Sequence, residues 1–192
     1  MSQTPSNGGN GPAKGIISRE AVVTPRPRRF YKAVNVETTG DQYRVALDGR
    51  PVKTPGKQPL TLPNRALAEA IAAEWEAQGN EIIAETMPLT RLANTIIDGV
   101  IGNEAAVRDD IAAFSGTDLV CYRAEAQEGL VDAQAQAWDQ VLAWAHKVLD
   151  ANFRIAVGIV HVAQPLSAIQ SVSCALDGLD AWQLAPLHQL TT

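Results

Sequence analysis

The sequence predicts an α+β fold, in which a small antiparallel β-sheet with helices is followed by an α-helical bundle. Two observations predict it. Short stretches of alternating apolar and polar residues, separated by turn signals, fill much of the first third of the chain. From Asn64 onward, apolar residues recur every three to four positions, as they do on one face of a helix. We expect a disordered basic tail at 1–27, an α+β domain at 28–102 and a helical domain at 103–192.

The tail contains few large apolar residues and ends in the stretch Thr24-Pro25-Arg26-Pro27, which favours disorder. It lacks the apolar core of a secretory signal. No apolar run in the sequence approaches the roughly 18 residues that a membrane span needs. We therefore expect a protein of the bacterial cytoplasm that does not enter a membrane, with the mitochondrial matrix as the alternative location.

The composition, 46% hydrophobic and 19% charged residues, is that of a globular chain that buries its own core without disulfides or metals. Its two cysteines, Cys121 and Cys174, do not form a C-x-x-C pair, which argues against a thiolate zinc site or a redox motif. We expect two buried, reduced thiols.

Charge is divided unevenly along the chain. Residues 1–65 contain 11 Lys or Arg and 4 Asp or Glu, a balance of +7, whereas residues 66–192 contain 5 and 17, a balance of −12; the sum is the net charge of −5. Such polarity favours oriented docking onto a partner. The alternative is a basic tail and hairpin beside ordinary solvated acidic helices.

The first strands surround a hairpin turn. A β-favouring stretch runs from Phe30 to Val36, and an alternating strand ends at Leu47. Asp48-Gly49 is a strong signal for a two-residue turn, because a type I′ turn needs positive φ at both central residues. The return strand, residues 50–54, contains Pro51, which cannot donate to the ladder and so predicts an edge strand. Further short strands are expected at 60–62 and 81–84.

Two helices follow in the same half. Asn64 is placed to cap the first, whose apolar stripe is Leu67, Ile71 and Trp75, and Gly79 is placed to end it. The second is expected at about 88–101, with Pro88 in its first turn.

Apolar periodicity in the second half of the sequence predicts four further helices. One starts after Gly102 and presents Val107, Ile111 and Phe114 on one face. A long one covers 131–149, and others follow Pro165 and Asp180. The long helix is expected to turn these residues inward: Trp138, Val141, Leu142, Ala145, Val148 and Leu149. The last helix carries Trp182, Leu184, Leu187 and Leu190 but has no evident partner for that face. Residues 119–122 are either helix or strand, and 153–162 are ambiguous.

Signatures of catalysis are missing from the sequence. Gly56-Lys57 lacks the upstream glycine of a phosphate-binding loop, and no G-x-S-x-G elbow occurs. The three histidines, His146, His161 and His188, are isolated from one another, so we expect structural roles rather than a metal site. The sequence therefore predicts a non-enzyme without a metal or cofactor.

Several segments, taken in order, carry a family resemblance. They are Arg29-Phe30-Tyr31-Lys32, Leu47 to Pro55, Glu74-Trp75 with Gln78, Met87 to Thr90, Asn94-Thr95, Thr117-Asp118-Leu119, Cys121-Tyr122-Arg123, Trp138-Asp139 and Gln164-Pro165. Together they resemble the assembly chaperones of the ATP synthase α subunit, that is, the mitochondrial F(1) complex assembly factor 2 type and its bacterial relatives. The resemblance covers about residues 29–190.

The resemblance implies binding of the free F(1) α subunit and shielding of the surface that β later covers, without ATP hydrolysis. Members of that family continue past this point with further helices that carry acidic residues and tryptophan, so we expect this chain to be truncated at its C-terminus. The chain is expected to be monomeric when free and to bind no nucleic acid. The alternative is a structural or nucleic-acid-binding adaptor that uses the basic N-terminal arm.

The candidate contacts with the client come from two places. They are Arg50 and Lys53 on the edge hairpin, Asp118, Tyr122 and Arg123 after the third helix, and Trp75 on the first helix. Trp75, Trp138 and Trp144 lie in amphipathic helices, where core packing is expected and a partner-facing anchor is the alternative.

Overall fold

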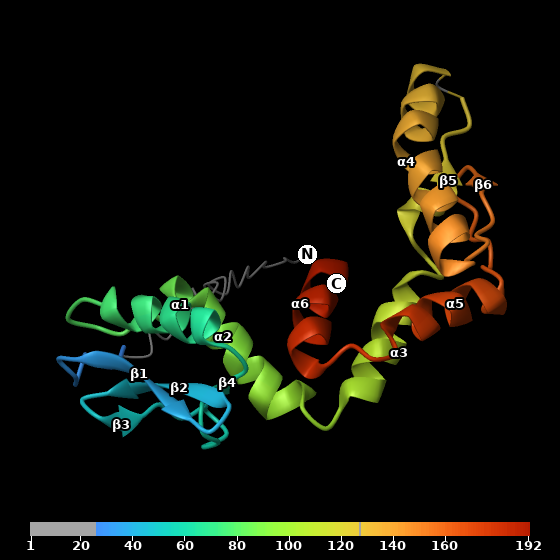
Figure 1. Cartoon of the computed structure of the whole chain (residues 1–192). Helices are drawn as coiled ribbons and strands as arrows, with labels where there is room; N and C mark the ends of the chain where they lie inside the picture. The colour runs from blue at the N-terminus through green and yellow to red at the C-terminus, as the bar shows by residue number, and fades with distance from the viewer. Residues whose placement is uncertain (1–25, 127) are drawn as a thin grey trace, which may run out of the picture.

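A computed structural model describes residues 26–126 and 128–192 (Figure 1). It confirms the α+β fold: a small antiparallel sheet covered by helices lies at the start of the described chain, and helices make up most of the rest. Nearly all of the predicted tail lies outside the described residues. No helix within the described ranges is long and apolar enough to cross a membrane.

The sheet is built around β2 (Gln42–Leu47), which pairs antiparallel with β1 (Val34–Thr39), β3 (Arg50–Pro51) and β4 (Thr61–Leu62). Asp48 and Gly49 have φ of 48° and 76°, so both turn residues adopt the predicted positive φ. Pro51 lies on the edge strand β3, also as predicted.

Two strand predictions were wrong in detail. The first strand begins at Val34 rather than Phe30, because the preceding residues turn toward the end of α1 (Arg65–Glu76): the Tyr31 hydroxyl donates to the Trp75 carbonyl at 2.7 Å. Residues 81–84 do not form a strand. Only Glu81 bridges to Arg28, and a 3₁₀ turn, η1 (Ala84–Thr86), follows.

Helix α1 begins at the predicted cap, where the Asn64 side chain accepts from the Leu67 amide at 2.9 Å. It ends at Glu76, three residues before Gly79. Its buried face closes the core over the sheet, together with part of α2 (Pro88–Thr95). The buried members of this core are Tyr31, Val45, Leu47, Val52, Leu60, Leu62, Ala68, Ile71 and Ala93.

The predicted helix over 88–101 is α-helical only as far as Thr95. It then continues as a π-helical turn, η2 (Ile96–Val100). From this turn, Asp98 reaches back to the sheet, where its carboxylate accepts from the Thr54 hydroxyl at 2.6 Å and the Gly56 amide at 2.8 Å. A Cβ on Gly56 would lie 2.6 Å from that carboxylate, so glycine permits the close approach.

The second half begins with α3 (Glu104–Phe114) and ends with α5 (Leu166–Leu176) and α6 (Ala181–Thr191). The last helix does have a partner, contrary to the sequence-based expectation. It folds back so that Leu184 packs with Ile111 of α3, and Ala181 and Ala185 pack on η2. The predicted boundary at residue 102 falls between η2 and α3, and the division into two domains stays a prediction.

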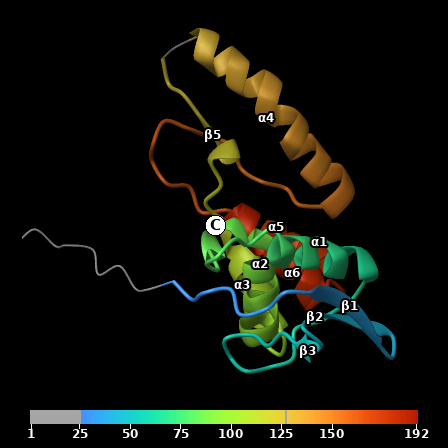
Figure 2. The same ribbon diagram turned by 90° about the vertical axis from the view of Figure 1, so that its left-hand side faces the viewer.

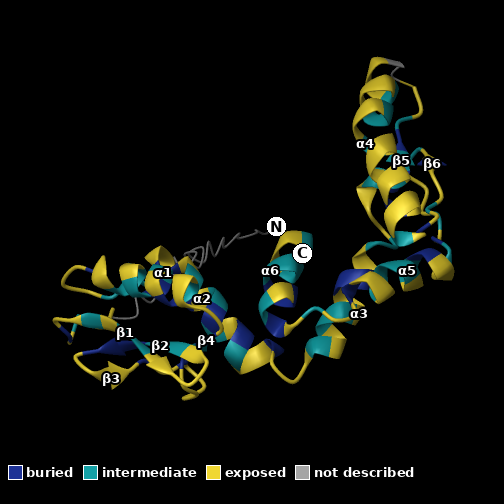
Figure 3. Ribbon diagram, viewed as in Figure 1, coloured by how far each residue is buried: buried dark blue, intermediate teal, exposed yellow. Residues whose placement is uncertain are grey.

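Helix α4 (Glu128–Leu149) rises away from the sheet and from α6 (Figures 1 and 2). Beside it, β5 (Tyr122–Arg123) and β6 (Ala156–Val157) form a short parallel pair, which settles part of the ambiguous segments as strand. Residues 119–121 form the 3₁₀ turn η3 (Leu119–Cys121). Figure 3 shows that most of the surface of α4 is exposed.

The predicted inward stripe of α4 is therefore only partly right. Ala145 is buried and Leu149 packs with Ala151 and Ala168, but Val141 and Val148 are exposed. Trp144, for which core packing was expected, is exposed as well. The expectation of two buried thiols is also only half right, because Cys121 is buried and Cys174 is exposed. Burial raises the pKa of the Cys121 thiol, which keeps it protonated.

Candidate partner-binding surfaces

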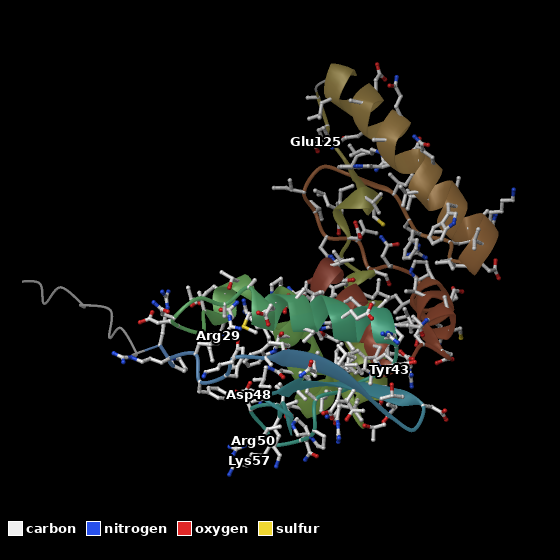
Figure 4. The ribbon with its side chains drawn as sticks, turned by 60° about the vertical axis from the view of Figure 1, so that its left-hand side comes forward. Arg29, Tyr43, Asp48, Arg50, Lys57 and Glu125 are labelled. Carbon is white, nitrogen blue, oxygen red and sulfur yellow. The ribbon has the colours of Figure 1, made fainter. Side chains whose placement is uncertain are left out.

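The predicted hairpin contacts, Arg50 and Lys53, are exposed on the outer edge of the sheet. Figure 4 shows Arg50 and Lys57 at this edge, away from the helices. Neither Arg50 nor Lys53 forms an ion pair within the described residues. Positive charge at this edge is thus available to an acidic partner surface.

Asp48 anchors the hairpin that carries Arg50. Its carboxylate accepts hydrogen bonds from the backbone N–H groups of Ala33, at 2.8 Å, and Lys32, at 3.1 Å. These two bonds stabilise the ionised form and hold the pKa of the Asp48 carboxyl below its usual value.

Replacing Asp48 with asparagine should therefore destabilise the protein in a pH-dependent way. The depressed pKa of Asp48 favours folding above the unfolded-state pKa of about 4, and this contribution is lost as pH falls through the lower folded-state pKa. Asparagine tolerates the positive φ, so it removes only the charge. Urea unfolding at pH 7 should show a less stable Asp48→Asn variant, and the difference should shrink at pH 3. An equal difference at both pH values would contradict this account.

Trp75 lies mainly inside the fold. It packs against the core beneath α1, edge to face with Tyr31 at 5.7 Å between ring centroids. Its indole nitrogen is buried and has no hydrogen-bond partner among the residues that the structure describes. These contacts agree with the core packing expected for this residue and leave little of it for a partner.

Asp118 precedes η3, and Tyr122 and Arg123 form β5; both elements lie against α4. Figure 1 shows this place far from the hairpin. Asp118 caps η3 by accepting from the Val120 amide at 2.8 Å. Arg123 is only 7% exposed; its guanidinium donates to Asp139 at 2.5 Å and to the Val120 carbonyl. Its charge is therefore largely satisfied within the fold.

Sequence reasoning missed an exposed apolar stripe on α4. The stripe consists of Leu130, Ala137, Val141, Trp144 and Val148. A second stripe, with Trp138, Leu142, Ala145 and Leu149, faces β5 and α5. On a helix of 3.6 residues per turn the two stripes lie about 100° apart. Testing the helix for two stripes instead of one would have found the exposed one.

A further exposed apolar segment includes β6 and the residues on either side of it. Ile155, Val157, Ile159 and Val160 are all exposed, and Ile159 is 100% exposed. Gly158 has φ of 82°, and its amide donates to the Arg123 carbonyl at 2.8 Å, so the segment is tied to β5 at this point. Within the described ranges, no three His, Cys, Asp or Glu side chains gather closely enough to hold a metal ion.

Known proteins resemble this chain over most of its length. A family model described as ATP12 chaperone protein matches residues 28–146, which is more than half of the chain.

The chain belongs to the ATP12 chaperone family.

The solved structure of Atp12 from Paracoccus denitrificans is 43% identical, with a TM-score of 0.82, over 86% of this chain and 71% of that one. The Atu1473 protein of Agrobacterium tumefaciens is 42% identical, with a TM-score of 0.80, over 86% of this chain and 62% of that one. The mitochondrial protein atp12 of Schizosaccharomyces pombe is 25% identical over 183 residues. This chain spans 62% of the length of the S. pombe protein.

Several residues on which the resemblance to the ATP12 family rested make contacts inside the fold. The Glu74 carboxylate accepts from the Leu89 and Thr90 amides at the start of α2. The buried Gln78 side chain donates to the Glu74 carbonyl in α1 and accepts from the Ile83 amide just before η1. Gln164 both donates to and accepts from the backbone of Arg154. These polar residues hold the fold together.

Proposed function

We propose that this ATP12-family chain is a non-catalytic chaperone of ATP synthase assembly. In this proposal it binds the free α subunit of the F(1) sector and covers the surface that the β subunit later contacts. Family membership supports the assembly role. We expect the chain to act where F(1) is assembled, in the bacterial cytoplasm or the mitochondrial matrix; its bacterial and mitochondrial relatives are compatible with both.

The observation that carries the proposal is the exposed apolar surface of α4 and of residues 155–160. Contiguous exposed apolar patches mark interaction sites on proteins. Trp144, 53% exposed in the C-terminal half of the α4 stripe, has the size and amphipathic ring typical of interface anchors. Free subunits of an assembly also expose apolar interfaces that aggregate, so an apolar mask with a polar rim suits this task.

Size-exclusion chromatography with purified α subunit tests the proposal. Wild-type chain should co-elute with α and be displaced when β is added. The double variant Trp144→Asp and Val148→Asp should bind at least about tenfold more weakly, because it places charge in the apolar contact. The matched control, Gln136→Asp and Ala143→Asp, adds the same charge to exposed positions of the same helix outside the stripe and should bind normally.

The basic hairpin provides a second contact in this proposal. Association with α should weaken as salt rises, and the variant Arg50→Glu and Lys53→Glu should lower the association rate. Unchanged binding by this variant would remove the hairpin from the proposal. If P. denitrificans Atp12 binds its α subunit under conditions in which this chain binds none, the proposal fails for this chain.

A further inference from the structure

A groove runs between α2–η2 and α6, with α3 at its base. Its volume is about 640 Å³. One side is lined along α2 and η2 by Pro88, Leu89, Arg91, Leu92, Thr95 and Gly99. Ala185, His188 and Gln189 of α6 line the other side, and Val100 and Val107 complete the lining.

The groove has the shape and lining of a helix-binding site. The positions on α2–η2 recur every three to four residues, so they follow one side of the helix for three turns, or roughly 16 Å. A groove between two helices with an apolar lining is a common site for the apolar face of a third, amphipathic helix. None of the proposed contacts on α4 or the hairpin belongs to this groove.

The π-helical turn η2 keeps the groove open at Gly99. Asp98 is held on the sheet side by Thr54 and Gly56, while its neighbour Gly99 lies on the groove side. A Cβ at Gly99 would meet no atom of the described residues within 4 Å, so this part of the groove wall is formed by backbone alone. π-helical turns occur often at functional sites.

The charged groups around the groove indicate which occupant it would accept. Arg91 is exposed on the groove wall and forms no ion pair within the described residues. On the opposite wall, His188 Nε2 lies 2.6 Å from Asp110 Oδ2, so each of these groups already has a partner. The unpaired charge at the groove is thus positive, and it favours a carboxylate on the occupant.

We propose that this groove binds an amphipathic helix of the client subunit, with its apolar face toward Leu92 and Val100 and a carboxylate opposite Arg91. This inference rests on the proposed function and adds a second docking surface to it. The client segment is expected to be a helix with apolar residues at successive turns and one Asp or Glu beside them.

Filling the groove tests the inference. The variant Gly99→Leu adds a side chain to open space and should raise helix propensity, so the fold should survive, as thermal unfolding would verify. Its affinity for purified α subunit should fall at least about tenfold. The matched control is Gly129→Leu on α4, another helical glycine whose Cβ would meet nothing within 4 Å, and it should bind as wild type does.

A peptide experiment identifies the occupant. Overlapping 20-residue peptides that cover the α subunit are titrated into the chain, with binding followed by fluorescence anisotropy. The peptide that binds wild type and Gly129→Leu but not Gly99→Leu should carry an Asp or Glu. Changing that residue to Lys should abolish binding to wild type and restore it to Arg91→Glu.

The outcomes separate the two proposals. If the whole α subunit binds wild type and Gly99→Leu equally, the groove inference is overturned while the chaperone proposal stands. If wild type forms no complex with α, the chaperone proposal fails first. A bound peptide whose affinity ignores the charge at Arg91 would also overturn the groove inference.

Discussion

Replacing Leu184 with alanine is expected to lower the free energy of unfolding by about 2–5 kcal/mol. Leu184 is the largest fully buried side chain of α6: its exposed fraction is 0%, and it packs with Ile111, Ala112 and Leu176. Alanine would leave a cavity where α3, α5 and α6 meet, which these helices can fill only in part. Chemical denaturation, followed by circular dichroism, measures the loss.

Leu190 provides the matched control, because it lies on the same helix and is 86% exposed. Leu190→Ala should change stability by no more than about 0.5 kcal/mol. If the two variants were equally stable, α6 would not be held in the position described. The groove would then lose one wall, so this measurement also bears on the inferred client site.

Replacing Glu74 with alanine is expected to lower the free energy of unfolding by about 2–4 kcal/mol, because its carboxylate accepts hydrogen bonds from three donors at the start of α2. It accepts from the Leu89 amide at 2.7 Å, the Thr90 amide at 2.8 Å and the Thr90 hydroxyl at 2.7 Å. Glu74 therefore caps α2 from a different helix and adds a negative charge at its positive end. Thr90 is buried, so water cannot easily replace these bonds.

Glu69 on the same helix distinguishes the lost cap from the lost charge. In the described part of the chain its carboxylate pairs only with Arg65 four residues earlier, at 2.7 Å, and both side chains are well exposed. Glu69→Ala should cost no more than about 0.5 kcal/mol, as exposed i,i+4 pairs do. Glu74→Gln should remain destabilised, since its amide group cannot accept from all three donors. A Glu74→Ala variant as stable as Glu69→Ala would show that the cap is dispensable.

The predicted site residues differ in how far the sequence could foresee their surroundings. Arg50 and Lys53 follow a turn signal whose geometry is local, so their exposure on an edge strand was predictable. Arg123 was offered as a partner contact because of its place in a motif. Its burial beneath Trp138 and its bond to Asp139 depend on where α4 packs, which no local pattern reveals.

By itself, the sequence determined the α+β class, the Asp48-Gly49 hairpin, the start of α1 at Asn64 and most of the helices. These features depend on backbone preferences and periodicity within a few residues. Only the tertiary structure decided which apolar faces are covered: α6 found a partner through Leu184, whereas the face of α4 around Trp144 stayed open. The physical reason is that periodicity shows which side of a helix is apolar, but burial requires a second element, and that element's position follows from packing between residues far apart in the chain.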